Sequence, residues 1–334
     1  MFLKNLSADD APLMASALVG ACRIGPDWAL EVQPQLLAAV FRALLGFEAD
    51  FHTLEPATPE QIARALTTTG QRQDIIDLML TVELVCHPIP APLTESIDRW
   101  ALALGVENAE LQVSREIAQG ASAQAQFDLY RLGYWGTSVS QDEHFQMLFE
   151  RYGMKAYVLT VEPDAVEAAR WAALEQYSSD SLGRAIWTFY TERGFSFPGM
   201  IGGANKILAH HDWVHVLADY STTGLGEVEV GAFRATNTEF PGSTLAFIAG
   251  QLGFWQGGMI ESALTGRHQD HVLEVPGAPQ RVADALRRGR ECTRDLFVDL
   301  DFFDYADQSL AQLRQRWNIV PKAVDESPDH SLQA

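Results

Sequence analysis

The sequence predicts an all-α protein built from many short helices. Apolar residues recur at helical spacing through most of the chain, and few segments alternate strictly between apolar and polar residues. The 25 glycines and 15 prolines among 334 residues mostly fall between the periodic segments. We therefore expect helices joined by turns.

The first half should hold a run of amphipathic helices, each bounded by Gly or Pro. Thr58 begins one of them with the residues of a capping box, since Pro59 follows at the first helical position and Gln61 comes three residues after the cap. The expected helices are Gln35 to Leu45, Pro59 to Leu66, Gln71 to Val85, Leu93 to Leu104 and Ala109 to Ile117.

The same periodicity continues through the second half. Met154 to Val161 is the one stretch that competes as a short strand. The expected helices are Ala123 to Leu132, Asp142 to Tyr152, Pro163 to Gln176, Leu182 to Arg193, Gly203 to Tyr220, Glu227 to Thr236, Gly242 to Leu264, Gln280 to Arg294 and Ser309 to Trp317.

The small, polar segment Gly120 to Ala123 marks the predicted boundary between two helical domains. We expect one domain over residues 1–125 and a second over residues 126–324. Residues 325–334 should form a flexible tail, because Ser, Pro, Asp and His dominate them.

Composition excludes several classes of partner. The net charge is −20, from 24 Lys and Arg against 44 Asp and Glu, which argues against a nucleic-acid partner and against docking on anionic lipid by charge. Cys22, Cys86 and Cys292 are odd in number and far apart, so no disulfide framework or metal clip is predicted. No secretory pattern is visible at Met1 to Asn5. A cytoplasmic protein is expected, with peripheral membrane association left open.

Ser243 to Ser262 is nearly uncharged and almost long enough to span a bilayer. A buried helix is the better interpretation, because Gln251, Gln256 and Glu261 interrupt the apolar run and the rest of the chain is polar. Its glycines permit close helix packing or leave room for an apolar ligand, and packing is favoured. Stable membrane insertion is therefore not expected.

The sequence His211-Asp212-Trp213-Val214-His215, followed after eleven residues by Glu227, gathers four metal-binding side chains. On a helix, at about 100° per residue, His211, Asp212 and His215 share one face. Two histidines one turn apart can bind one ion, and Asp212 can supply an oxygen or orient an imidazole. The segment 221–226 should break the chain between helices, which places Glu227 in the first turn of the next helix.

Spacing alone is weak evidence for a metal. The chain has nine histidines, so a His-x-x-x-His pair can arise by chance, and a glutamate at a helix start is favoured by the helix dipole. Asp219, one turn beyond His215, is predicted to support a ligand. Arg234 lies on nearly the same helix face as Glu227 and would bind a substrate carboxylate or lie on the surface. His268 and His271 are expected to be solvated in a loop.

This pattern resembles the coenzyme Q biosynthesis protein 4 family, whose signature is His-Asp-x-x-His, eleven residues, then Glu. Every signature position is matched. The resemblance covers roughly residues 165 to 320 and includes the segments Ser181 to Ala185, Phe189-Tyr190, Gly289-Arg290, Leu296 to Asp301 and Leu310 to Ile319.

The resemblance implies a helical metal-binding domain that carries zinc on His211, Asp212, His215 and Glu227. The family is associated with prenylated lipids and with replacement of a ring carboxylate by hydroxyl. We therefore expect a metal-dependent enzyme that decarboxylates or oxidises an apolar aromatic or prenylated substrate, with Glu227 and Asp212 as catalytic groups. A non-enzymatic prenyl-lipid-binding scaffold with a structural metal and a metal-dependent hydrolase are the alternatives. Two His with two carboxylates also suit iron, manganese or cobalt, and a homodimer is left open.

The first half resembles the helical tellurite-resistance TerB-like domain. Asp74 to Cys86 and Leu93 to Val106 carry this resemblance. The acidic Asp-Gly turn typical of that family is replaced here by His87 to Pro92, so no metal is predicted in this half.

Overall fold

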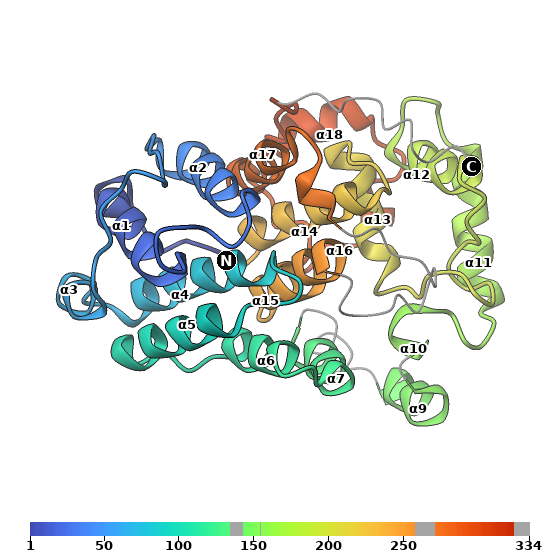
Figure 1. The fold of residues 1–334 in the computed structure, drawn as a ribbon. Helices are drawn as coiled ribbons and strands as arrows, with labels where there is room; N and C mark the ends of the chain where they lie inside the picture. Colours follow the sequence, from blue (N-terminus) through green and yellow to red (C-terminus); the bar gives the residue numbers. More distant parts are fainter. Residues whose placement is uncertain (134–142, 154, 258–270, 324–334) are drawn as a thin grey trace.

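The fold is all-α, as the sequence predicts. The computed structural model describes residues 1–133, 143–153, 155–257 and 271–323, and within those ranges the chain forms helices and no strand. The blue N-terminal helices lie on one side of the molecule and α9 (Glu143–Tyr152) and α11 (Ala165–Ala172) on the other (Figure 1). The predicted tail, residues 325–334, lies outside the described residues.

The first half contains the five helices that the sequence predicts. The capping box of α3 is present, because Gln61 N donates to Thr58 Oγ1 at 3.4 Å and Thr58 N donates to Gln61 Oε1 at 2.7 Å. The helices of this half, including α7, are α1 (Ala11–Cys22), α2 (Val32–Leu45), α3 (Pro59–Ala65), α4 (Thr69–Leu84), α5 (Ala91–Leu104), α6 (Ala109–Ala118) and α7 (Ser122–Leu132).

Helix α1 was not predicted. Met14, Ala15, Leu18 and Val19 are among its buried residues, and together they cover more than one face of the helix. A helix that is apolar on most sides has no amphipathic period, so periodicity could not find it.

The second half is also helical. Its elements, in chain order after α9, are α10 (Lys155–Val158), α11, a 3₁₀ turn η2 (Ala173–Gln176), α12 (Leu182–Glu192), α13 (Ala209–Ala218), α14 (Gly224–Asn237), α15 (Ser243–Leu245), a π-helical segment η3 (Ala246–Leu252), α16 (Gly253–Gly257), a 3₁₀ turn η4 (Val272–Glu274), α17 (Ala278–Glu291), a 3₁₀ turn η5 (Phe302–Tyr305) and α18 (Leu310–Arg316).

The suggested strand from Met154 to Val161 is wrong for its described part. Lys155–Val158 forms the helical turn α10, and only Leu159 makes an isolated bridge, to Ala204. One bridge without a continuing partner strand makes no sheet, so the β-branched and aromatic residues here fill a helical core.

Helix α14 lies at the centre of the molecule and packs against α13, α17 and η3. Helix α17 also packs against α2, so the two halves of the chain share a continuous apolar core. Phe2 joins them as well: its N–H donates to Ala235 O at 2.6 Å and its ring meets Phe247 edge to face at 5.6 Å. The boundary proposed at Gly120 to Ala123 falls in the link between α6 and α7 and stays a prediction.

The segment expected as one helix from Gly242 to Leu264 is divided. It begins as α15, widens into the π-helical segment η3 and returns to an α-helix in α16, while residues 258–270 lie outside the described ranges. Among the residues that the structure describes, none forms a helix with the length and apolar character that crossing a bilayer requires.

Candidate metal centre

Helix α13 carries both histidines of the predicted motif and starts later than expected. The chain from Gly203 first turns at Asn205, whose side-chain oxygen accepts the N–H groups of Ile207 and Leu208 at 3.0 and 2.8 Å. The helix itself begins at Ala209. His211 and His215 therefore stand one turn apart on a fixed helix.

Two arginines from the C-terminal region hold the other end of α13. Arg314 donates to the carbonyl oxygens of Val216 and Leu217 at 2.9 and 2.8 Å, and Arg288 donates to that of Ala218 at 2.8 Å. These carbonyl groups have no hydrogen-bond partner within the helix. They lie at its C-terminal end, where the helix dipole is negative and favours a cation. The two arginines thereby fix the helix that carries the histidines.

Helix α14 presents Glu227 in its first turn, as predicted. Thr223 is the N-cap, and its hydroxyl accepts the N–H of Gly226 at 3.2 Å. A Cβ at residue 226 would stand 2.0 Å from the carbonyl oxygen of Ser221, so only glycine lets the chain turn this tightly. The turn brings Glu227 back to the histidines.

The three side chains meet in space. Glu227 Oε1 lies 3.3 Å from His215 Nε2, and Glu227 Oε2 lies 3.5 Å from His211 Nε2. One donor atom from each of the three residues lies within 4.8 Å of the others. This spacing suits three ligands arranged around one ion at bond lengths of about 2.0 to 2.2 Å.

Backbone carbonyls orient both imidazoles. Leu208 O contacts His211 Nδ1, and Tyr220 O lies 3.3 Å from His215 Nδ1. A proton on each Nδ1 satisfies these carbonyls and leaves the Nε2 lone pairs directed toward Glu227. His215 Nε2 is buried and has no hydrogen-bond partner among the described residues, although Glu227 lies within ion-pair distance. A metal ion would supply the missing partner.

Asp212 lies beside this group and is held by Tyr190. The Tyr190 hydroxyl, on α12, donates to Asp212 Oδ2, while Asp212 Oδ1 lies 3.4 Å from His211 Nε2. Burial and the Asp212 charge raise the pKa of Tyr190 well above its ordinary value, so the phenol keeps its proton. Asp212 therefore offers one oxygen to the site and uses the other to bind Tyr190.

The pKa shifts of the site residues show that the carboxylates stabilise positive charge beside them. Burial lowers the pKa of His211, but the Asp212 charge and the Glu227 contact outweigh it and raise the pKa to about 9. Burial likewise raises the pKa of Glu227, yet His215 and His211 hold it well below its usual range. Burial raises the pKa of Asp212, although His211 and His215 oppose this. A divalent cation would supply this charge and leave the imidazoles neutral.

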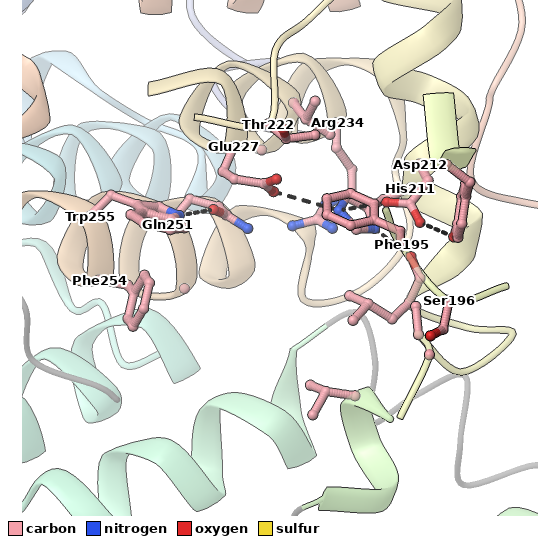
Figure 2. Close-up of a pocket in the computed structure, with 18 of the residues that line it drawn as sticks. Phe195, Ser196, His211, Asp212, Thr222, Glu227, Arg234, Gln251, Phe254 and Trp255 are labelled. Atoms are coloured by element: carbon pink, nitrogen blue, oxygen red, sulfur yellow. Dashed lines mark hydrogen bonds and ion pairs between the residues drawn. The ribbon is translucent and has the colours of Figure 1, made fainter. Parts of the chain in front are cut away.

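The candidate ligands open onto a cavity of about 480 Å³. His211, Asp212 and Glu227 form one part of its wall (Figure 2). The rest is largely aromatic, aliphatic and glycine, from residues Leu129, Tyr130, Val158, Tyr190, Phe195, Leu208, Val230, Gly231, Phe254 and Trp255. The volume and the lining suit a small apolar molecule with a few polar groups.

The structure brings Arg234 to this cavity and leaves Asp219 outside it. Arg234 is 2% exposed and lines the wall, as the predicted substrate-binding role requires. Asp219 does not support a ligand: it ends α13 in the left-handed conformation, with φ 61°, and its side chain is 77% exposed toward Lys322. Helix α13 ends one residue before Asp219, so Asp219 does not lie on the helix face that carries His215. His271 is exposed and bonded to Glu274, and His268 lies outside the described residues.

Two site residues were missed from the sequence as functional groups. Tyr190 stood in the resembling segment without a role, and Gln251 was counted only as a polar interruption of an apolar run. The spacing of Tyr190 could not reveal its partner, because Asp212 is 22 residues away and meets it only in the folded chain. Trp255 is four residues after Gln251, a helical spacing that could have indicated their hydrogen bond.

No family model matches the sequence, and no curated protein matches it either.

Proposed function

We propose that this protein is a metal-dependent enzyme that decarboxylates or oxidises an apolar aromatic or prenylated compound. The observation that carries the proposal is the convergence of His211, His215 and Glu227 beside a largely apolar cavity whose wall His211 and Glu227 help to form. The resemblance of the same residues to the coenzyme Q biosynthesis protein 4 signature supports it.

The residues present fit a divalent ion, with zinc first and iron, manganese or cobalt as alternatives. His211, His215 and Glu227 would hold it, and Asp212 would add an oxygen or orient His211. His215 Nε2 is buried and makes no hydrogen bond among the described residues, with only Glu227 Oε1 beside it at 3.3 Å, which supports a bound cation. Such an ion acts as a Lewis acid toward a substrate oxygen when bound.

The protein's own groups would perform the remaining steps. Phe195, Phe254 and Trp255 line the cavity and would bind an apolar ring or chain while excluding water from it. Asp212 lines the same cavity with Tyr190 fixed on its far oxygen, so its near oxygen is positioned to take or return a proton. Decarboxylation needs such a group, because the ring carbon that loses CO₂ must be protonated.

The test compares wild type with Glu227→Gln at equal metal loading on a panel of prenylated aromatic acids, with CO₂ release and product mass as readouts. We expect the variant to fold but to lose turnover at least about tenfold, because the charge that balances the ion is removed. Glu239→Gln, at an exposed carboxylate just beyond α14, is the matched control and should keep wild-type activity.

Equal activity of Glu227→Gln and wild type would reject the catalytic role of Glu227. Metal-loaded wild type that binds the compounds and converts none of them would favour the lipid-binding scaffold. Hydrolysis of ester analogues without CO₂ release would favour the hydrolase.

A further inference from the structure

Gln251 presents the donors of its amide NH₂ group to the cavity. Its Oε1 accepts the indole N–H of Trp255 at 3.1 Å. An indole nitrogen can only donate, so the amide oxygen must face Trp255 and the NH₂ group must point away from it, as Figure 2 shows. Among the residues that the structure describes, Nε2 donates to no acceptor, and Gln251 lines the cavity. The acceptor for this group must therefore come from water or from a ligand.

Gly231 fixes the position of this amide. A Cβ on residue 231 would stand 2.5 Å from Gln251 Cγ, so the glutamine side chain packs directly against the α14 backbone. Gly231 follows Glu227 by four residues, and this spacing places both on one face of the helix. The Gln251 side chain therefore crosses α14 about one helical turn from the candidate metal ligand.

The π-helical segment η3 brings Gln251 to this wall. A π-helix has a wider turn than an α-helix, and such segments often occur at functional sites. Gly250 and Gln251 both belong to η3 and both line the cavity. Gly250 has no side chain, so it leaves space beside the amide for a ligand atom.

The charges on the cavity wall favour an uncharged acceptor for this amide. Glu227 and Asp212 line the cavity, and the divalent ion of the proposed function would balance their two negative charges. Arg234, on the same wall, already has an interaction partner in the folded chain, and we assign no ligand group to it. An amide N–H is itself neutral, so it binds a carbonyl or ether oxygen without needing a charge on the ligand.

We propose that Gln251 determines ligand specificity by donating a hydrogen bond to an uncharged oxygen, a ring carbonyl or an ether, on an otherwise apolar ligand. This proposal rests on the proposed function for the identity of the cavity as the substrate site. A few placed donors in an apolar cavity orient a ligand, so this bond decides which end of the ligand faces the metal centre. A ligand without such an oxygen leaves the amide unpaired and binds more weakly.

The experiment measures binding of matched bicyclic probes to the full-length, zinc-loaded protein by titration calorimetry. Tetralone carries a ring carbonyl, methoxytetralin an ether oxygen, tetralin the same rings without oxygen, and tetralin carboxylate an anion. The affinity of each oxygen-bearing probe is expressed relative to tetralin and compared between wild type and variant, because this double difference cancels the unequal hydrophobicity of the probes. The neutral probe with the larger difference identifies the carbonyl or the ether source.

Two substitutions remove the donor in different ways. Gln251→Leu keeps the approximate side-chain volume without the NH₂ group, and we expect it to lower the relative affinity of at least one neutral oxygen-bearing probe about tenfold. Gly231→Ala adds a methyl group where Gln251 Cγ lies, so it should displace the amide and lower the same relative affinity. Ser196→Ala, an exposed hydroxyl on the cavity lining, is the matched control and should keep the wild-type preference.

His215→Ala separates this inference from the metal proposal. The variant should lack the ion, and the effect of adding Gln251→Leu to it should persist, because the amide binds the ligand oxygen directly. If the effect of Gln251→Leu disappears in that background, the ion and not the amide binds the oxygen, and the assignment of Gln251 is wrong.

Three further results would overturn the assignment. Gln251→Leu could leave the relative affinities of both neutral probes unchanged or lower only that of the carboxylate, Ser196→Ala could abolish the preference, or wild type could bind none of the probes. The first two results would leave the loss of turnover expected for Glu227→Gln unaffected, so a failure of this inference is distinguishable from a failure of the proposed function.

Discussion

Gly289 of α17 lies against the carbonyl oxygen of Phe233 in α14, so closely that a Cβ on residue 289 would stand 2.1 Å from that oxygen. The side-chain hydroxyl of Thr236, which donates to Leu286 O at 2.6 Å, fills the same contact. Helix α14, which carries Glu227, therefore packs against α17 through direct backbone contact at Gly289.

Gly289→Ala should lower the free energy of unfolding by about 1 to 3 kcal/mol, because neither backbone can yield without separating α14 from α17. Urea unfolding followed by circular dichroism measures the loss. Gln280→Ala, at an exposed position of the same helix, should change stability by less than about 0.5 kcal/mol. Equal stability of the two variants would mean that the helices tolerate separation here.

His215→Ala should abolish stoichiometric metal binding, because it removes one imidazole of the chelate. Elemental analysis of the purified full chain should fall from about one zinc per chain to below about one tenth. The matched control is His210→Ala on the same helix, whose Nε2 instead contacts Leu296 O at 2.8 Å. Loss of metal from the control and retention in His215→Ala would place the ion elsewhere.

Tyr190→Phe should leave the fold intact and weaken zinc binding by roughly 10- to 100-fold, as removal of a group that orients a ligand commonly does. The variant loses only the hydroxyl that donates to Asp212. Competition with a chelator of known affinity gives the dissociation constant. Unchanged affinity would show that the hydrogen bond from Tyr190 to Asp212 does not affect zinc binding.

Asp74 should make the protein less stable as pH rises through weakly acidic values. Burial raises the pKa of its carboxyl from 3.8 to about 6, even though Asn5 N donates to it at 2.7 Å. The folded state therefore holds this proton more tightly than the unfolded state does. Its contribution to stability is complete below about pH 4 and is lost by about pH 6, a change of up to about 3 kcal/mol.

Asp74→Asn isolates that contribution, because an amide cannot ionise and its oxygen can still accept from Asn5. As pH rises from 4 to 6, the free energy of unfolding of the variant should increase relative to that of wild type. A constant difference across that window would show that Asp74 ionises normally in the folded protein.

The metal motif could be predicted because its signals are local. Helical geometry alone predicts that His211 and His215 lie one turn apart. Thr223 and Gly226 indicate the break between helices before Glu227. Asp219 was misassigned for an equally local reason. Helical geometry was extended one residue past the true end of α13, where the chain becomes left-handed.

The rest of the site depends on contacts that no local pattern encodes. Tyr190 reaches Asp212 across 22 residues, and Gln251 packs on Gly231 across two helices. The widened turn of η3 also has no sequence signal, since an apolar run with glycines is compatible with an α-helix. Helix α1 could not be predicted because it is buried on most sides, so its sequence has no amphipathic period.

The bonds from Arg288 and Arg314 to the end of α13 also set an order of assembly during synthesis. Arg314 follows Leu217 by 97 residues, and Arg288 follows Ala218 by 70. While the histidine helix is emerging from a ribosome, neither donor has yet been made, so its last carbonyls depend on water. The helix that carries the two histidines is held at both ends only after both arginines have been translated, so the proposed ion would bind late in the synthesis of the chain.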